Sequence, residues 1–209
     1  MTSIRSFIYQ LFRRSEFITI VSGLPRSGTS LMMSALKAGG MELIVDGIRE
    51  ADANNPQGYF EYERAKKLVE GDTRWLNTAQ GKAVKIISAL LEYLPRDFQF
   101  RVIFMERDMD EILASQQRML ERLGLGDDAA VPDDEIRRSF QEHLDEIRSW
   151  LPDQDWIHVL FISYNDVLRK PEAIFHQVAD FLDHHVDSDP MSSVVDLSLY
   201  REKNERMCT

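Results

Sequence analysis

The sequence predicts an α/β fold, a three-layer sandwich in which a central parallel sheet is flanked by helices. Four short runs of β-branched and aromatic residues are apolar enough to be strands that are buried on both faces. Helical patterns lie between these runs, and strands that alternate with helices are typical of a parallel sheet with helices on both faces. The expected strands cover residues 16–24, 82–88, 100–107 and 156–164.

The expected helices are supported by the residues at their ends. Gly39, Gly71 and Gly124 each follow a helical pattern, where glycine commonly ends a helix. Pro171 stands at a first helical position, which suits proline because the N–H of that position would have no helical partner. The expected helices cover residues 29–38, 61–70, 109–123, 134–151 and 171–182.

Length and composition favour a single domain over residues 1–209. The chain has 209 residues, of which 44% are hydrophobic, and this suffices for one core. Its one cysteine, Cys208, excludes an internal disulfide and favours a reducing, cytoplasmic location. No apolar run has the length of a membrane span. The formal net charge of −10 disfavours nucleic-acid binding, so an anionic ligand must be held by a local cluster of donors.

Residues 1–15 are expected to form an amphipathic helix. Ile4, Phe7 and Leu11 fall on one helical face, with arginines nearby. This face either packs on the domain itself or binds a membrane surface or a partner.

The segment "IVSGLPRSGTSLM", residues 20–32, has the layout of a phosphate-binding loop. Gly23 and Gly28 are separated by four residues between an expected strand and an expected helix. Backbone N–H groups and the positive end of the helix dipole meet at such a loop and favour a phosphate. Nucleotide hydrolases carry a lysine after the second glycine, whereas this chain has Thr29 there and Arg26 upstream. The motif predicts a P-loop-like fold; a plain strand-to-helix turn is the alternative.

The stretch "GLPRSGTSLM" resembles the loop that binds the 5′-phosphosulfate in sulfotransferases that use 3′-phosphoadenosine 5′-phosphosulfate (PAPS). In that family a Pro, a Lys or Arg, Ser, Gly, Thr and a Thr or Ser follow the first strand. The resemblance implies that Arg26 is also a catalytic cation. The residues that it assigns to the 5′-phosphate and the sulfuryl group are Pro25, Arg26, Ser27, Gly28, Thr29 and Ser30.

The segment "VIFMERDMDEILAS" is similar to the 3′-phosphate site of the same family. There a strand ends in an arginine, and a serine eight residues later lies on the next helix; Arg107 and Ser115 have this spacing. The alternatives are a surface ion pair of Arg107 with Asp108 or Asp110 and a solvated Ser115. Asp108 and Glu111 also resemble a capping box at the start of the helix.

The resemblance extends to "FISYNDVLRKPEAIF" and to "DLSLYREKN" near the C-terminus. Tyr164 stands where sulfotransferases carry a Tyr-Glu-Asp-like tripeptide at the end of a late strand, and this implies a contact with the adenosine of the donor. Arg201 is implied to lie near the 3′-phosphate. The alternatives are a tyrosine at the edge of the core and an ordinary charge in the tail.

The catalytic groups match the family only in part. The segment "VKIIS" keeps the lysine of the family as Lys85, but Ile87 stands where many cytosolic members have a histidine base. Other branches use a glutamate upstream of the lysine, and Glu61 is our first choice for the proton acceptor. Glu50, Asp52 and Glu63 are alternatives, and so is a capping role for Glu61 at a helix start.

The resemblance implies sulfuryl transfer from PAPS to a hydroxyl or amine acceptor, with adenosine 3′,5′-bisphosphate (PAP) as the product and with no metal required. A homodimer is possible. Two other classes stay open: a kinase-like phosphotransferase, which the missing loop lysine disfavours, and a silent nucleotide-binding module. Trp75, Phe140 and Trp150 could line an acceptor pocket or fill the core.

Overall fold

A computed structural model describes residues 17–47, 58–122, 124 and 132–196 of the chain. The helix predicted for residues 1–15, the candidate Arg201 and the alternative bases Glu50 and Asp52 lie outside these residues. None of the helices in the described part is long and apolar enough to cross a membrane.

The central sheet of the described chain has five parallel strands in the order β2-β3-β1-β4-β5. Its strands are β1 (Phe17–Gly23), β2 (Leu43–Ile44), β3 (Ala83–Lys85), β4 (Gln99–Glu106) and β5 (Ile157–Ser163). The four predicted strands are confirmed, although β3 is shorter than expected, and β2 was missed. Because all strands run the same way, their carboxyl ends lie at one edge, where ligands bind in open α/β sheets.

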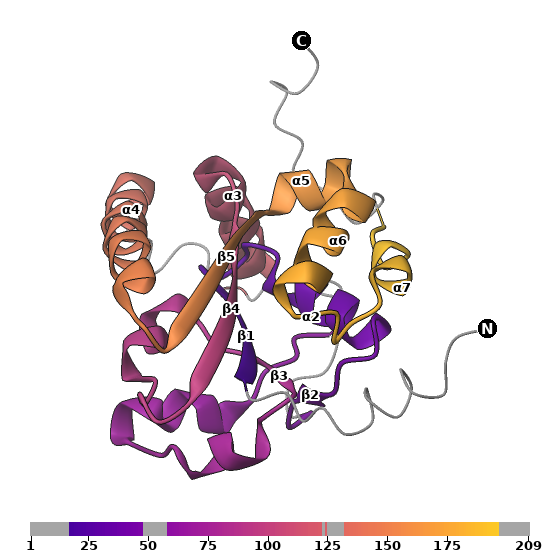
Figure 1. The fold of residues 1–209 in the computed structure, drawn as a ribbon. Coiled ribbons are helices and arrows are strands. Elements are labelled where there is room, and N and C mark those ends of the chain that lie inside the picture. Colours follow the sequence, from indigo (N-terminus) through magenta and orange to yellow (C-terminus); the bar gives the residue numbers. More distant parts are fainter. Residues whose placement is uncertain (1–16, 48–57, 123, 125–131, 197–209) are drawn as a thin grey trace, which may run out of the picture.

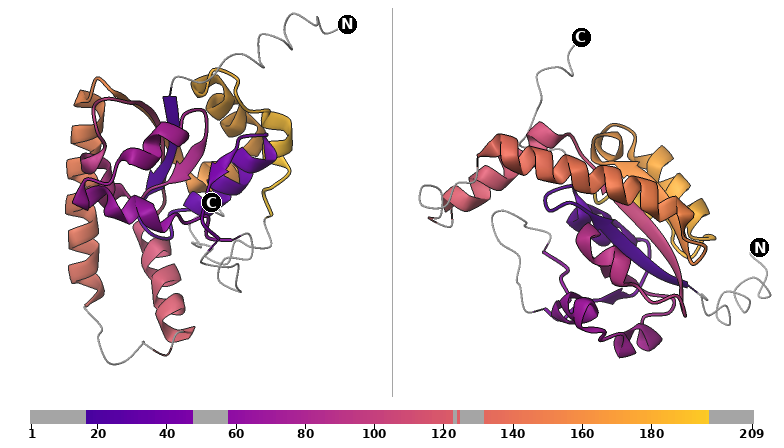
Figure 2. Two further views of the ribbon diagram at one scale, coloured as in Figure 1. Left: turned by 90° about the horizontal axis from the view of Figure 1, so that it is seen from below. Right: turned by 90° about the vertical axis from the view of Figure 1, so that its left-hand side faces the viewer.

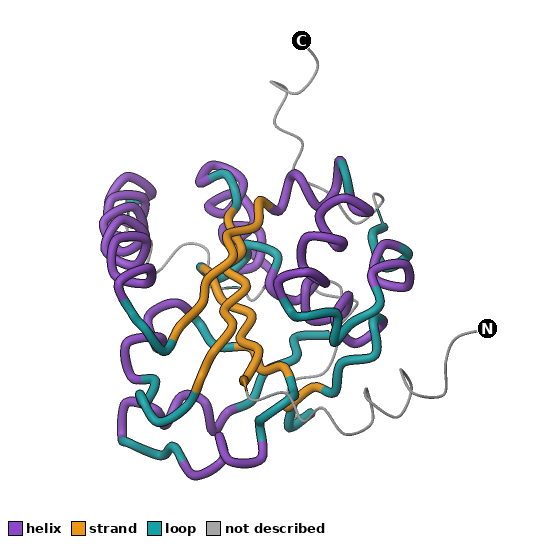
Figure 3. The backbone as a smooth tube through the Cα atoms, viewed as in Figure 1, coloured by secondary structure: helices purple, strands orange, loops and turns teal. Residues whose placement is uncertain are grey.

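Helices cover both faces of the sheet and form the predicted three-layer sandwich (Figure 1; Figure 3). One face carries α2 (Thr29–Ala38), α5 (Tyr164–Arg169), α6 (Pro171–Phe181) and α7 (Ser188–Ser192). The other face carries α3 (Met109–Arg122), α4 (Asp133–Trp150) and the 3-10 helices η1 (Glu63–Glu70), η2 (Arg74–Thr78), η3 (Ser88–Tyr93) and η4 (Leu151–Asp153). Both views in Figure 2 show α3 and α4 side by side.

The alternation of buried side chains along β1 explains why both faces are covered. All seven residues of this strand are buried. Ile18 and Ile20 enter the core under α3, α4 and the 3-10 helices, whereas Phe17 and Val21 enter the core under α2, α6 and α7. A strand that is apolar on both faces needs a helical layer on each of them.

Two predicted boundaries are corrected. The helix expected from Glu61 is the 3-10 helix η1, which begins at Glu63 after the extended residue Tyr62. Tyr164 does not end a strand; it opens α5, because the Ser163 hydroxyl accepts a hydrogen bond from the backbone N–H of Asp166 and caps that helix.

Candidate active site

The loop between β1 and α2 depends on two glycines. Gly23 has a φ of 143°, and a Cβ added there would lie 2.5 Å from the Met105 carbonyl oxygen. Gly28 has a φ of 99°, and an added Cβ would lie 2.3 Å from Cδ2 of Tyr164. No larger residue fits either position without a shift of its neighbours. The loop is therefore packed tightly against the end of β4 and the start of α5.

Polar groups converge at the start of α2. The helix begins at Thr29 directly after Gly28, so its first backbone N–H groups and the positive end of its dipole point toward the loop. Ser27 is 1% exposed, and its hydroxyl has no hydrogen-bond partner within the described residues. A buried hydroxyl without a partner, beside several N–H donors, is suited to an anionic ligand.

Two hydrogen bonds join this loop to the segment after β4. The Nε of Arg26 donates to the Ser115 hydroxyl on α3 at 2.9 Å. The Nη1 of Arg107 donates to the backbone oxygen of Arg26 at 3.1 Å. Arg26 itself has a left-handed φ of 70°, which is uncommon for a residue with a side chain. The phosphate-binding loop and the segment that contains Arg107 and Ser115, which carry two separate sequence motifs, thus lie in contact.

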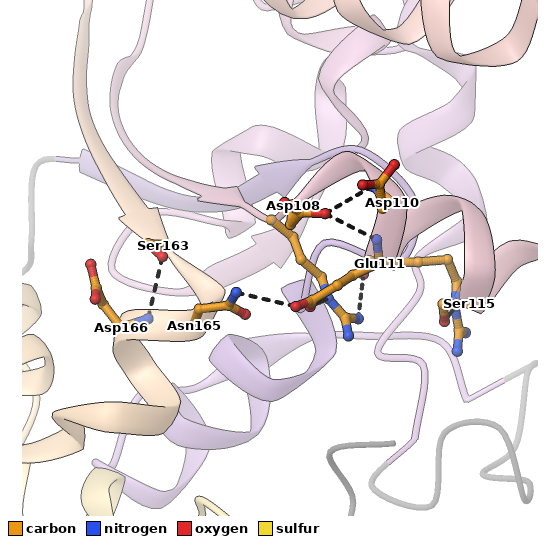
Figure 4. A network of polar contacts seen from close by, with 9 residues as sticks. Asp108, Asp110, Glu111, Ser115, Ser163, Asn165 and Asp166 are labelled. Atoms are coloured by element: carbon orange, nitrogen blue, oxygen red, sulfur yellow. Dashed lines mark hydrogen bonds and ion pairs between the residues drawn. The ribbon is translucent and has the colours of Figure 1, made fainter. Parts of the chain in front are cut away.

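Arg107 forms a buried ion pair, not the surface pair that was considered as an alternative. Its Nε donates to Oε2 of Glu111 at 2.8 Å, and the two side chains are 7% and 4% exposed. Asp110 instead pairs with Arg137, and Asp108 caps α3 by accepting from the N–H groups of residues 110 and 111. Figure 4 shows Asp108 and Glu111 at the start of this helix.

Tyr164 lies between the loop and Arg107. The Cζ of Arg107 is 4.3 Å from the centre of the tyrosine ring, a distance at which a guanidinium is attracted to an aromatic face. A Cβ added at Gly28 would clash with this same ring. Burial raises the pKa of the Tyr164 hydroxyl above its ordinary value of 10.0. The hydroxyl, which is protonated at neutral pH in any case, therefore keeps its proton further into the alkaline range and can donate a hydrogen bond.

Lys85 ends β3 next to β1, at the same edge of the sheet. Its Nζ donates to the backbone oxygen of Tyr59 at 3.0 Å and lies 3.4 Å from the Ser30 hydroxyl on α2. The lysine therefore joins the first turn of α2 to the segment that contains Glu61. Glu61 itself is half-buried, and its backbone oxygen accepts from the N–H of Asp46 at 3.3 Å.

The sequence pattern of the sulfotransferase domain matches residues 18–209. The chain belongs to the sulfotransferase family. Its activity is accordingly PAPS-dependent sulfuryl transfer, and family membership leaves the acceptor open.

Two solved sulfotransferases share the fold. Sulfotransferase STF9 from Mycobacterium avium has 14% identity and a TM-score of 0.52, over 96% of this chain and 72% of that one. Mouse sulfotransferase SULT7A1, solved as a complex with PAP, has 11% identity and a TM-score of 0.50, over 98% of this chain and 74% of that one. No curated protein matches the chain by sequence.

Among the sulfotransferase residues that the sequence singled out, two groups in contact can be described. Arg26, Arg107, Ser115 and Tyr164 form one group around the loop, and Lys85 with Ser30 forms another. Pro25 is exposed at the tip of the loop, and Glu61 follows Tyr59 in the chain.

Sequence reasoning missed Glu111 and Asn165 as members of this site. The Nδ2 of Asn165 donates to Oε1 of Glu111 at 3.3 Å, so these two residues extend the Arg107 ion pair toward α5 (Figure 4). The spacing of four residues between Arg107 and Glu111 was a usable signal, because such a pair can meet across one helical turn. As half of a capping box, Glu111 would bond the backbone near Asp108, but its carboxylate contacts Arg107 and Asn165.

The aromatic candidates for an acceptor pocket belong to the core of the sulfotransferase domain. Trp75 is 3% exposed, and Phe140 and Trp150 pack against the same buried cluster. Among the described residues, no group of three His, Cys, Asp or Glu side chains is placed to hold a metal ion.

Proposed function

We propose that this sulfotransferase binds PAPS across the carboxyl edge of its sheet and transfers the sulfuryl group to a hydroxyl or amine acceptor. The observation that carries the proposal is the pair of hydrogen bonds that joins Arg26 to Ser115 and Arg107 to Arg26. A donor with phosphates at both ends of one nucleoside requires two neighbouring anion sites. The loop after β1 and the segment after β4 lie next to each other and would each bind one of these anionic groups.

The 5′ end of the donor fits the loop. The loop supplies the backbone N–H groups of Gly28, Thr29 and Ser30 at the start of α2, two hydroxyls in the first turn and the cation of Arg26. The buried Ser27 hydroxyl, which has no partner within the described residues, supports this assignment, since native proteins rarely leave such groups unsatisfied.

The 3′ end of the donor fits Arg107 and Ser115. A guanidinium carries enough N–H donors to contact a carboxylate, a carbonyl and a phosphate at once. Tyr164 would contact the adenosine through its ring and its protonated hydroxyl. We also assign Arg201, which lies outside the described residues, to the 3′-phosphate on the resemblance alone.

PAPS, when bound, supplies an activated sulfuryl group. The protein must then stabilise the charge that grows on the leaving phosphate, which fixed cations and N–H donors do best. Lys85, 3.4 Å from the Ser30 hydroxyl, lies beside the loop and would serve this purpose together with Arg26. Glu61 would accept the proton of the acceptor, because no histidine follows Lys85 at the position that the family uses.

We further propose a cytoplasmic location, on the ground that one cysteine in 209 residues is typical of a reducing compartment. The homodimer stays a prediction from the sequence.

Nucleotide binding and turnover test the proposed function. In titration calorimetry, PAP should bind without magnesium and more tightly than ATP does with or without it. A preference for ATP with magnesium would favour a kinase-like enzyme and contradict the proposal. Turnover of PAPS with a panel of hydroxylated and amine acceptors then tests the catalytic step, and tight PAP binding without any turnover would favour the silent module.

A further inference from the structure

Glu111 is a buried carboxylate whose two oxygens contact two different elements. It lies in the first turn of α3 and is 4% exposed. Its Oε2 accepts from Nε of Arg107 at 2.8 Å, and its Oε1 accepts from Nδ2 of Asn165 on α5 at 3.3 Å. In Figure 4 the Glu111 side chain extends from α3 toward Asn165. The carboxylate therefore connects the start of α5 with the arginine that follows β4.

We propose that Glu111, held by Asn165, is a positioning residue for the 3′-phosphate of the donor nucleotide. It acts by fixing the guanidinium of Arg107 in the orientation that receives this phosphate. The inference rests on the proposed function, since it takes Arg107 as the ligand of the 3′-phosphate.

The guanidinium of Arg107 is fixed from three directions. Glu111 accepts from its Nε, the Arg26 carbonyl accepts from its Nη1, and the Tyr164 ring lies 4.3 Å from its Cζ. A long arginine side chain loses rotamer freedom when it binds a ligand, and contacts that already hold it reduce this loss at the moment of binding. A planar guanidinium also binds a phosphate well only when its plane is correctly oriented.

Glu111 is itself held in place before it orients Arg107. The Asp108 carboxylate accepts from the backbone N–H of Glu111 at 3.3 Å and so caps the turn that carries it. Asn165 follows Tyr164 directly, so the hydrogen bond to Glu111 and the ring under Arg107 come from adjacent residues of α5. Adjacent residues on one short helix thus orient both the carboxylate and the guanidinium.

A structural role for the ion pair alone explains less of this arrangement. Burying two opposite charges contributes little net stability, because the desolvation of both groups offsets their attraction. The negative charge of Glu111 also repels a phosphate bound nearby. Glu111 therefore strengthens phosphate binding only if its orienting effect on Arg107 is larger than this repulsion. The sign of the effect of Glu111 on phosphate binding therefore separates positioning from repulsion.

The experiment compares the affinities of PAP and adenosine 5′-monophosphate, which differ only in the 3′-phosphate. Glu111→Gln keeps the shape of the side chain and removes its charge, and Glu121→Gln makes the same change on an exposed part of α3 as the control. Wild type should prefer PAP. Glu111→Gln should lower that preference about tenfold, through weaker PAP binding, with the affinity for the monophosphate unchanged within about twofold. Glu121→Gln should leave both affinities unchanged.

A double-mutant cycle ties the effect to Arg107. In an Arg107→Met background, which lacks the guanidinium, adding Glu111→Gln should change the PAP preference no further. Asn165→Ala, which keeps both charges, should lower the preference by a smaller factor of about three. This variant keeps the inference testable if Glu111→Gln does not fold.

Three results would overturn the positioning role: an unchanged PAP preference in both Glu111→Gln and Asn165→Ala, equal losses for the two nucleotides, or tighter PAP binding in Glu111→Gln. A wild-type protein that binds the two nucleotides equally would instead contradict the assignment of Arg107 within the proposed function. The two failures are therefore distinguishable in one series of titrations.

Discussion

The Nε of Arg26 lies 2.9 Å from the Ser115 hydroxyl, although 89 residues separate them in the chain. The loop after β1 and the helix after β4 therefore meet through side chains. The resemblance assigns Arg26 to the sulfuryl end of the donor and Ser115 to its 3′-phosphate end. Arg26 therefore lies near the proposed sites for both the sulfuryl end and the 3′-phosphate end of the donor. Its role is decided by measuring nucleotide affinity and turnover separately.

We expect Arg26→Ala to reduce turnover more than nucleotide binding. The charge that Arg26 would stabilise grows as the sulfuryl group departs, so kcat should fall by about 10²–10³-fold, the usual effect of losing one preorganised donor. PAP affinity should fall by less than about tenfold. Arg137→Ala, which removes a surface arginine paired with Asp110, is the control for both measurements.

The opposite pattern would give Arg26 another role. A raised Michaelis constant for PAPS with intact turnover is what uniform binding predicts. Arg26 would then act beside Ser115 at the 3′-phosphate end and not on the transferred group.

Gly28→Ala should destabilise the protein and abolish donor binding. A side chain there meets a left-handed backbone, which costs about 1–2 kcal/mol, and a clash with the Tyr164 ring, which adds about 1–3 kcal/mol. Gly71→Ala is the matched control, because Gly71 has a φ of 79° and no atom within 4 Å of an added Cβ. Urea unfolding should show the larger loss at Gly28, and only that variant should lose PAP binding. Equal losses of stability would mean that the Tyr164 ring moves aside.

The buried Tyr164 should make the free energy of unfolding depend on pH in the alkaline range. Its pKa is raised above the ordinary value of 10.0 by burial, so the unfolded chain releases this proton at lower pH than the folded protein does. The contribution of Tyr164 is fully present below pH 10 and is lost as the pH rises through the higher folded-state value. Wild type should therefore lose unfolding free energy above pH 10 more steeply than Tyr164→Phe. Tyr93→Phe, at an exposed tyrosine, should follow wild type. Parallel curves for wild type and Tyr164→Phe would contradict the raised pKa.

The sequence predicted the parts of the fold that have strong local signals. β1, β4 and β5 were recognisable as runs of β-branched and aromatic residues, and α2 because it lies between Gly28 and Gly39. The expected burial on both faces holds for β1, whereas β5 lies at the edge of the sheet and is only partly buried. β2 escaped prediction, since a strand of two residues has no periodicity of its own and exists through its pairing with β3. The short helix α5 was missed because the Ser163 cap that starts it lies inside a run that reads as a strand.

The residues of the candidate site also include some that the sequence predicts and some that it does not. The spacing of Arg107 and Ser115 could be read from the sequence, and the structure brings both residues to the loop. The contact of Arg26 with Ser115 could not be predicted, since it depends on β1 and β4 being neighbours and on a left-handed backbone at Arg26. Glu111 was visible in the sequence, but its partner Asn165 comes from an element that was not predicted.

The identity of the base is tested with Glu61→Gln. The structure weakens the capping alternative, because η1 begins at Glu63 and the acidic residue in its first turn is Glu63. If Glu61 accepts the proton of the acceptor, the amide keeps the size of the side chain but loses its basicity. Turnover should then fall by about 10²–10⁴-fold, while PAP affinity and the melting temperature hardly change.

Glu70→Gln, at the exposed end of η1, is the control and should keep full turnover. A capping role for Glu61 predicts the reverse result for Glu61→Gln, a stability loss of about 0.3–1 kcal/mol with turnover nearly intact. Intact turnover would exclude Glu61 as the base. The search would then move to Glu50 and Asp52, since the carboxylate of Glu63 already pairs with Lys66 at 2.6 Å.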